Sequence, residues 1–290
     1  MISKLFIILI TWLLVPTLCI SSETLTVKHY QSQDRYELGI KILDLALSKL
    51  DTDYKIQATD EEINEARGEA QVIDGLLDIE FMITTEDREK NMIPIKIPIY
   101  RGTLGLRLLL IKKERQKELK NISNIKQLRK YVGGHGKHWS DLAIYGHNNL
   151  PVITNVLYDN LFKQLISNRF DYFHRGILEI WQEKKQYSEH LTVADNIMIF
   201  YPQPTYFFVS KQRPKLALAI EKGLKQAIKD GSFKQLFLAH VGDDLKKAKL
   251  TTRTLIVLDN PILPSNTPLI DMTWWLPKKF QKQIMHPNQL

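Results

Sequence analysis

Short apolar runs alternate with helical patterns along the first part of the chain. Residues 25–30 alternate apolar and polar side chains, and the apolar residues of 38–50 recur at helical spacing. The pattern predicts a second strand at 53–59, a second helix at 60–77, and a third strand at 79–83 that is buried on both faces. Alternating strands and helices indicate an α/β fold with a largely parallel sheet.

Polar side chains follow the third strand directly. In open α/β sheets small molecules bind beyond the carboxyl ends of strands, so Thr84, Thr85 and Arg88 lie where a ligand is expected. Arg88 carries a planar fork of donors that suits a carboxylate or phosphate, and the threonines can add hydroxyl contacts. The alternative is that these residues open a solvated helix with Thr85 as N-cap. Tyr36, in a loop at the same edge, either stacks on a ligand or packs in the core.

Two apolar, proline-containing segments, 97–112 and 197–209, have the pattern of strands that cross between two lobes. We expect hinges near Thr103 to Leu106 and near Gln203 to Tyr206.

These crossings divide the chain into parts. Residues 22–104 and 206–250 are expected to form the first lobe, and residues 105–205 the second. The proline-rich residues 251–290 predict an extended C-terminal tail that packs on the first lobe.

Residues 131–141, Tyr-Val-Gly-Gly-His-Gly-Lys-His-Trp-Ser-Asp, contain three glycines between a short strand and a predicted helix. Such a loop can point amide N–H groups at an anion. It is not a P-loop, because the glycine spacing differs and His138 follows the lysine. A plain turn and a metal site of His135, His138 and Asp141 are the alternatives.

Composition and charge narrow the class of protein. With 290 residues, 44% of them hydrophobic, the chain can form two lobes with separate cores. The net charge of +8 favours anionic ligands or surfaces, although a lysine surplus also serves solubility. The chain carries no aromatic and basic motif for nucleic acid, so nucleic acid is not an expected partner.

Residues 1–21 have the pattern of a cleaved secretory signal. Lys4 precedes an apolar run and Pro16, and Cys19 and Ser21 are small residues at cleavage spacing. An uncleaved membrane anchor is the alternative, but the apolar run is too short to span a bilayer. We therefore expect a periplasmic protein whose mature chain has no cysteine and forms no disulfide.

The Thr-x-x-Arg of residues 85–88, followed by Pro-x-Tyr at 98–100, resembles the bacterial extracellular solute-binding proteins of family 3, which are type II periplasmic binding proteins of the amino-acid type. Asp-Gly-Ser-Phe-x-x-Leu-Phe at 230–237 resembles their closing segment, so the resemblance covers about residues 24–240. It implies two lobes, each a mostly parallel sheet flanked by helices, joined by two crossing strands. In this family the arginine after the third strand holds the ligand's carboxylate, and the resemblance assigns that role to Arg88.

The resemblance also implies ligand contacts from the second lobe. In the family a glycine-rich loop with a helix start and a strand after Arg-x-Asp, here residues 169–171, end at the cleft. The candidate ligand-binding residues are therefore Tyr36, Phe81, Thr84, Thr85, Arg88, Gly136, His138, Trp139, Ser140, His174, Arg175 and Glu179.

One strand end departs from the family pattern. Amino-acid binders place an aspartate there to pair with the ligand's ammonium group, whereas this chain has His174 and Arg175. A cation about 4 Å away repels an ammonium group by about 4 kcal/mol at an effective dielectric near 20. We therefore expect a dicarboxylate, a phosphorylated molecule or an acidic peptide fragment rather than a free amino acid. The alternative is that Glu179, one helical turn past Gly176, supplies the missing carboxylate.

The sequence thus predicts a monomeric exported solute-binding protein that closes on a small anionic solute. It would deliver the solute to a membrane partner, either an uptake permease or a sensor receptor, without a cofactor, a metal or catalytic residues. A periplasmic enzyme on the same fold is the alternative, with His174 or Glu179 as general base. A structural protein of the envelope, which would not respond to any solute, is a third possibility.

Overall fold

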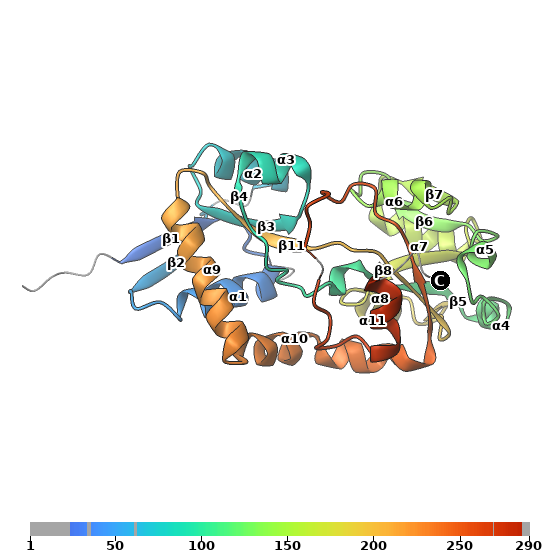
Figure 1. Cartoon of the computed structure of the whole chain (residues 1–290). Helices are drawn as coiled ribbons and strands as arrows, with labels where there is room; N and C mark the ends of the chain where they lie inside the picture. Colours follow the sequence, from blue (N-terminus) through green and yellow to red (C-terminus); the bar gives the residue numbers. More distant parts are fainter. Residues whose placement is uncertain (1–23, 34–35, 61–62, 269, 286–290) are drawn as a thin grey trace, which may run out of the picture.

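The structure is a computed structural model that describes residues 24–33, 36–60, 63–268 and 270–285. The predicted signal peptide lies outside these residues. Two α/β lobes lie side by side, and a long helix extends from the first lobe to the second (Figure 1). The C-terminal segment also passes along both lobes. None of the helices in the described part of the chain has both the length and the apolar character needed to cross a membrane.

The first lobe combines the N-terminal elements with a segment that returns late in the chain. Its elements are β1 (Leu25–His29), α1 (Glu37–Leu47), β2 (Tyr54–Ala58), α2 (Glu65–Ile73), β3 (Ile79–Ile83), α3 (Glu86–Asn91), β4 (Ile93–Ile95), β11 (Thr205–Val209) and α9 (Pro214–Lys229). Strands β1 and β2 pair in parallel, and β11 pairs antiparallel with both β3 and β4. Two contacts show that strand β3 runs parallel to β1. Lys28 bonds Asp78, and three residues further along both segments Gln31 bonds Phe81.

The second lobe contains one mixed sheet. Its elements are β5 (Leu106–Lys112), α4 (Gln116–Leu119), α5 (Ile125–Leu128), β6 (Gly133–Gly136), α6 (Leu142–His147), β7 (Val152–Asn155), α7 (Tyr158–Ile166), β8 (Tyr172–Gly176), α8 (Ile180–Gln186), β9 (Leu191–Val193), β10 (Ile197–Phe200) and β12 (Thr254–Val257). The strand order is β12-β10-β5-β8-β6-β7, with β9 also on β5. Strands β6, β7 and β8 are parallel, and β5 is antiparallel to its neighbours.

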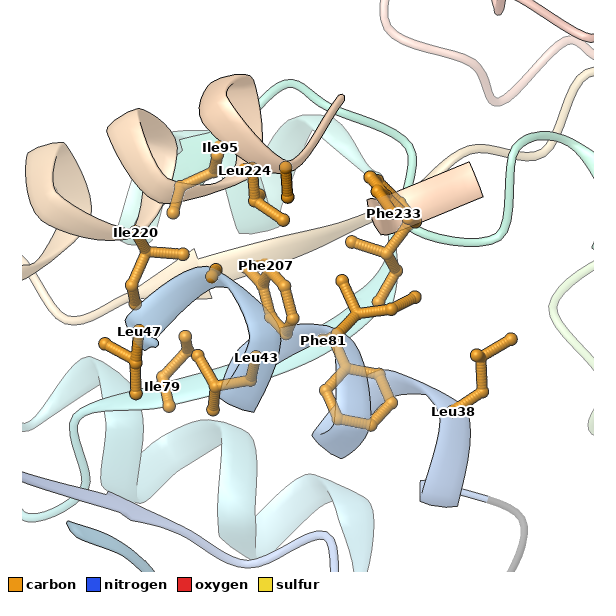
Figure 2. Packing of buried hydrophobic residues seen from close by; sticks show 14 of the residues in the cluster. Leu38, Leu43, Leu47, Ile79, Phe81, Ile95, Phe207, Ile220, Leu224 and Phe233 are labelled. Carbon is orange, nitrogen blue, oxygen red and sulfur yellow. The ribbon is translucent and has the colours of Figure 1, made fainter. Parts of the chain in front are cut away.

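Apolar side chains build the core of each lobe. In the first lobe, α1 and α9 cover the β3–β11 sheet, and Figure 2 shows Phe81 and Phe207 packed among leucines and isoleucines of these helices. The spacing that predicted the first helix also sets which residues face inward: Leu38, Ile42 and Ala46 are buried.

Parts of the C-terminal segment form regular structure on the second lobe, where the sequence predicted an extended tail on the first lobe. Strand β12 pairs in parallel with β10, and α11 (Lys278–Met285) packs beside β12. Leu255, Leu276 and Phe280 are part of the second lobe's core. Strand β12 was not predicted, because a run of four residues carries too little periodicity to indicate a strand.

The described residues between β12 and α11, 258–268 and 270–277, form a strap that also contacts the first lobe. Asn260 donates to Pro202 O in the second crossing, and Lys96 beside β4 donates to Asn266. At the first crossing, the Arg101 side chain donates to Asp271, and the Arg101 carbonyl accepts from Trp275 Nε1 at 2.9 Å.

Helix α10 (Ser232–Ala248) adds another connection between the lobes. Its first turns bury Phe233 and Phe237 in the first lobe's core, whereas Ala248 at its end lies in the second lobe's core. Trp274 of the strap packs edge-on against Phe233 and Phe237. Besides the two crossings, helix α10 and the strap therefore link the lobes, and the predicted hinge motion at the crossings stays a prediction.

We expect Asp271→Asn to lower the free energy of unfolding by roughly 1–3 kcal/mol, because it weakens the partner of the buried Arg101 guanidinium. Urea denaturation measures this change. Asp243→Asn is the matched control, since Asp243 pairs with Lys246 in a solvated ion pair. Equal stability of the two variants would show that the Asp271–Arg101 pair does not stabilise the fold.

Candidate functional site

The carboxyl ends of strands from both lobes meet at the two crossings. After β3, Thr84 N donates to Pro204 O in the second crossing at 3.0 Å. In the second lobe, Gly176 at the end of β8 pairs with Arg107, which lies just after the first crossing. Because β6 is parallel to β8, its carboxyl end lies at the same edge. The line between the lobes is thus the place where polar loop residues of both sheets converge.

On the first lobe, Arg88 is already engaged by a carboxylate of the chain. Its Nε and Nη2 donate to Glu69 Oε1 and Oε2 at 3.2 and 2.9 Å, and its Nη1 donates to Ile83 O at 2.9 Å. This is the bidentate geometry that a ligand carboxylate was expected to adopt. Glu69 is absent from the predicted site, because its position on α2 does not reveal which side chain it meets.

The two threonines follow the alternative interpretation of this stretch. Thr85 is the N-cap of α3 and accepts from Arg88 N at 3.2 Å, as a helix start requires. Thr84 is buried and donates its hydroxyl to Glu89 at 2.7 Å. Both hydroxyl groups therefore serve the local fold.

Phe81 and Tyr36 belong to the core of the first lobe. The Phe81 ring packs edge-on against the rings of Tyr36 and Phe207, and its exposed fraction is 4%. Phe81 is thus a core residue and not a ligand contact, because both faces of β3 are covered. The Tyr36 hydroxyl donates to Glu65 at 2.7 Å, which brings a further acidic group to this edge.

Glu80 is a buried acid behind this edge. Its side chain is fully buried on β3 and accepts from the Tyr30 hydroxyl at 2.9 Å. Burial, together with the nearby Glu69, raises the pKa of Glu80 to about 7. Glu65, Glu69, Glu80 and Arg88 form what we call the lobe 1 network.

On the second lobe, Arg107 joins both crossings to α6. Its Nε donates to Tyr201 Oη at 2.6 Å, and its Nη2 donates to Asp141 at 3.0 Å and to Gln203 at 3.2 Å. Tyr201 donates to the same Asp141 oxygen at 2.6 Å. Burial alone would raise the pKa of Asp141, but the Arg107 guanidinium and the neighbouring His135 ring together outweigh burial and hold this pKa below its usual range. Arg107 is absent from the predicted site because its neighbours in sequence are those of an ordinary buried strand.

Arg175, the cation expected at the end of β8, is buried and paired with carboxylates of the segment that follows the strand. Its Nε lies 2.8 and 2.9 Å from the two oxygens of Glu183, and its Nη2 lies 2.9 Å from Glu179. The guanidinium also lies 4.9 Å from the ring centroid of Trp139 and 5.3 Å from that of Tyr158. The carboxylates of α8 fold back over the strand end, which the sequence spacing alone did not indicate.

Glu179 is the exposed acid at this strand end. Its Oε2 accepts from Gly176 N at 3.2 Å, which confirms the alternative that Glu179 reaches back to the end of β8. The exposed fraction of its side chain is 51%. A Cβ added to Gly176 would lie 2.9 Å from Glu179 Oε2 and 3.2 Å from Arg107 Nη1, so both charged groups flank this glycine. Arg107, Asp141, Arg175, Glu179 and Glu183 form the lobe 2 network.

The glycine-rich stretch forms a strand instead of an anion-binding loop. Gly133 to Gly136 make up β6, and the amides of Gly133 and Lys137 donate to carbonyls around β7. The Trp139 ring packs on Gly136 and stacks on Phe173. His138 and Ser140 lie exposed next to this edge, and their contact with a ligand stays a prediction.

His174 is enclosed within the second lobe. Its ring stacks on Tyr145 at 3.9 Å between centroids and lies 5.0 Å from the His135 ring. Burial first, and then the neighbouring His135, lower the pKa of His174 well below its usual value, so the ring is neutral.

In the described part of the chain, no three His, Cys, Asp or Glu side chains are arranged to hold a metal ion. A shallow depression lined by Leu218, Lys222 and Lys229 lies on the outside of α9, away from the strand ends.

Neither a family profile nor a curated protein sequence matches the chain. Solved structures do. An amino acid ABC transporter substrate-binding protein from Streptococcus pneumoniae bound to L-arginine superposes with a TM-score of 0.52 at 11% identity, covering 76% of this chain and 94% of its own. An ancestral cationic amino acid solute binding protein superposes with a TM-score of 0.51 at 18% identity, with coverages of 75% and 95%. A Bacillus subtilis protein reaches 0.53 at 15% identity, with coverages of 82% and 97%.

This chain has the two-lobed periplasmic binding protein fold. Of these three neighbours, the two that carry a functional name are a substrate-binding and a solute-binding protein, and the expected fold class is confirmed. At most 82% of this chain is covered, whereas nearly all of each neighbour is. Part of this chain therefore lies outside the region that superposes on these neighbours.

Proposed function

We propose that this chain is a solute-binding protein that holds a small molecule between its lobes. The observation that carries the proposal is that strand ends of both lobes bond to the same crossing of a periplasmic binding protein fold, Thr84 to Pro204 and Arg107 to Gln203. A ligand that contacts both lobes favours the state in which the lobes are close, and this needs no chemical step. Export to the periplasm and delivery to a permease or sensor receptor are part of the proposal.

We infer that the solute carries a positively charged nitrogen group, in place of the anionic solute that the sequence favoured. That expectation depended on Arg88 and Arg175, and both guanidinium groups are paired with glutamates. The two networks together contain three guanidinium groups, those of Arg88, Arg107 and Arg175, and six carboxyl groups, those of Glu65, Glu69, Glu80, Asp141, Glu179 and Glu183. Glu80 is partly protonated near neutral pH, because its pKa is raised to about 7, so at least five of the six are acidic groups that can carry charge. Although the protein is basic overall, this region is acidic and attracts cations.

The named neighbours agree with a cationic solute, since one is bound to L-arginine and the other is named for cationic amino acids. Glu179 is the residue best placed to meet an ammonium or guanidinium group. It is half exposed, and only one of its oxygens is engaged by Gly176 and Arg175.

An enzyme is less well supported by the same geometry. The exposed fraction of His174 is 1%, so this ring cannot reach a substrate as a general base must. Glu179 is accessible, but we find no acid or nucleophile placed opposite it in the two networks.

We expect Glu179→Gln to weaken the binding of a cationic solute by about tenfold or more, because a charge-assisted hydrogen bond contributes roughly 1.5–3 kcal/mol. A thermal-shift panel of arginine, ornithine, agmatine, putrescine, glutamate and succinate selects the solute, and calorimetry measures its dissociation constant. Glu189→Gln is the control, since Glu189 is an exposed glutamate of the same lobe. Stabilisation by succinate or glutamate alone would restore the anionic solute, and turnover of a stabilising compound would point to an enzyme.

A further inference from the structure

We propose that Glu69 makes this site selective for cations that carry no carboxylate group. The inference is about the solute class of the proposed function and depends on it. Glu69 would act as a built-in carboxylate that occupies Arg88, so that a solute needs to supply only positive charge.

The argument begins with the donors of Arg88. A guanidinium has five N–H groups, and three of them are engaged by the two Glu69 oxygens and by Ile83 O. The Nε–Nη2 edge, which binds a carboxylate side-on, is filled. An incoming carboxylate can reach only the two remaining N–H groups, one on each terminal nitrogen.

Charge weakens even that approach. Coulomb interactions fall only as the inverse of distance, so a Glu69 carboxylate on the adjacent edge cancels most of the attraction that the guanidinium exerts on a second anion. Glu65 lies on the same side and adds a further acidic group. The Arg88 and Glu69 side chains are only 18% and 24% exposed, so solvent screens these charges incompletely.

The other donors near the strand ends are engaged as well. The Gln31 amide forms hydrogen bonds with both the N–H and the carbonyl of Phe81, and Thr84 donates to Glu89. Across the line between the lobes, Arg175 is paired with Glu183. A solute carboxylate therefore meets no unpaired side-chain cation in the two networks, whereas a solute cation meets the spare oxygen of Glu179.

The fold holds Glu69 in place opposite Arg88. The side chain of Asn64 caps α2 by accepting from Arg67 N at 2.9 Å, which fixes where the helix begins. Gly68, the neighbour of Glu69, lies against the Tyr30 ring, and a Cβ there would be 2.4 Å from that ring. This close approach of α2 to the residue that follows β1 directs the next side chain, Glu69, toward α3.

Matched pairs of compounds that differ only in a carboxylate test the proposal. Isothermal titration calorimetry is carried out with arginine and its decarboxylated form agmatine, and with ornithine and putrescine, on the full mature chain. We expect the wild-type protein to bind the carboxylate-free member of each pair at least about tenfold more tightly. In Glu69→Gln, we expect the preference to shift by about tenfold or more toward the amino acid, because Arg88 regains an unbalanced charge.

Glu65→Gln is the matched control. It removes one acid from the same helix without touching Arg88, so it should weaken both members of a pair by a similar factor and leave their ratio unchanged. Thermal unfolding of each variant verifies that it folds.

The outcomes separate the two proposals. Tighter binding of the amino acids by the wild-type protein, or an unchanged ratio in folded Glu69→Gln, overturns the role of Glu69 and leaves solute binding intact. If none of the four compounds binds, the cationic solute itself is wrong, and the selectivity falls with it.

Discussion

Replacing Arg175 by methionine is expected to lower the free energy of unfolding by about 3–5 kcal/mol. The substitution keeps an unbranched side chain but leaves the Glu183 carboxylate without the cation that contacts both of its oxygens. Both side chains are more than 90% buried, and an uncompensated charge in that environment is strongly destabilising. Urea denaturation with linear extrapolation measures the loss.

Two further variants show whether the buried pair causes this effect. Glu179→Gln removes the exposed partner of Arg175 and should cost less than about 1 kcal/mol. Arg175→Met combined with Glu183→Leu should recover most of the lost stability, because replacing both partners by apolar groups leaves no buried charge. An Arg175→Met protein of normal stability that no longer binds its solute would return Arg175 to the ligand site.

A second large effect is expected in the pH dependence of stability. The pKa of Glu80 is raised to about 7 in the folded protein from a usual value of 4.5, so between these pH values the folded state binds more protons than the unfolded state. The contribution of Glu80 is therefore fully present below about pH 4.5 and is lost as the pH rises through 7. The difference of pKa corresponds to about 3 kcal/mol.

The measurement compares unfolding free energies of the wild-type protein and Glu80→Gln from pH 4.5 to 8. The variant keeps an acceptor for the Tyr30 hydroxyl but cannot titrate. Over this pH range its free energy of unfolding should therefore fall by about 3 kcal/mol less than that of the wild-type protein. Glu86→Gln, at the exposed start of α3, should behave like the wild-type protein. Parallel curves for wild type and Glu80→Gln would mean that Glu80 is ionised throughout.

Arg88 illustrates how far sequence reasoning about a site extends. Its position after a buried strand correctly indicated that it lies at the polar edge of the sheet. Whether its guanidinium is available depends on Glu69, which lies nineteen residues earlier on another helix. No periodicity connects these two residues, because their contact is made by the packing of α2 against β3 and Tyr30.

Arg175 and Phe81 show the same limit for charge and burial. A cation at this strand end was expected to repel an ammonium group, but Glu183 and Glu179 fold back onto Arg175 and pair with it. Phe81 lies in the strand that leads to the site, but neighbours on both sides of β3 enclose it. Local sequence specifies neither of these neighbours.

The sequence by itself determined the alternation of strands and helices, the two crossings and the N-cap at Thr85, because these depend on local periodicity and local hydrogen bonds. Only the tertiary structure decided which charges are paired, and therefore that the guanidinium groups of Arg88 and Arg175 are both engaged by glutamates. It also decided that the C-terminal residues join the second lobe and strap both lobes together. A pairing or a register between distant segments is decided by the complementarity of surfaces that exist only after folding, and sequence spacing does not encode it.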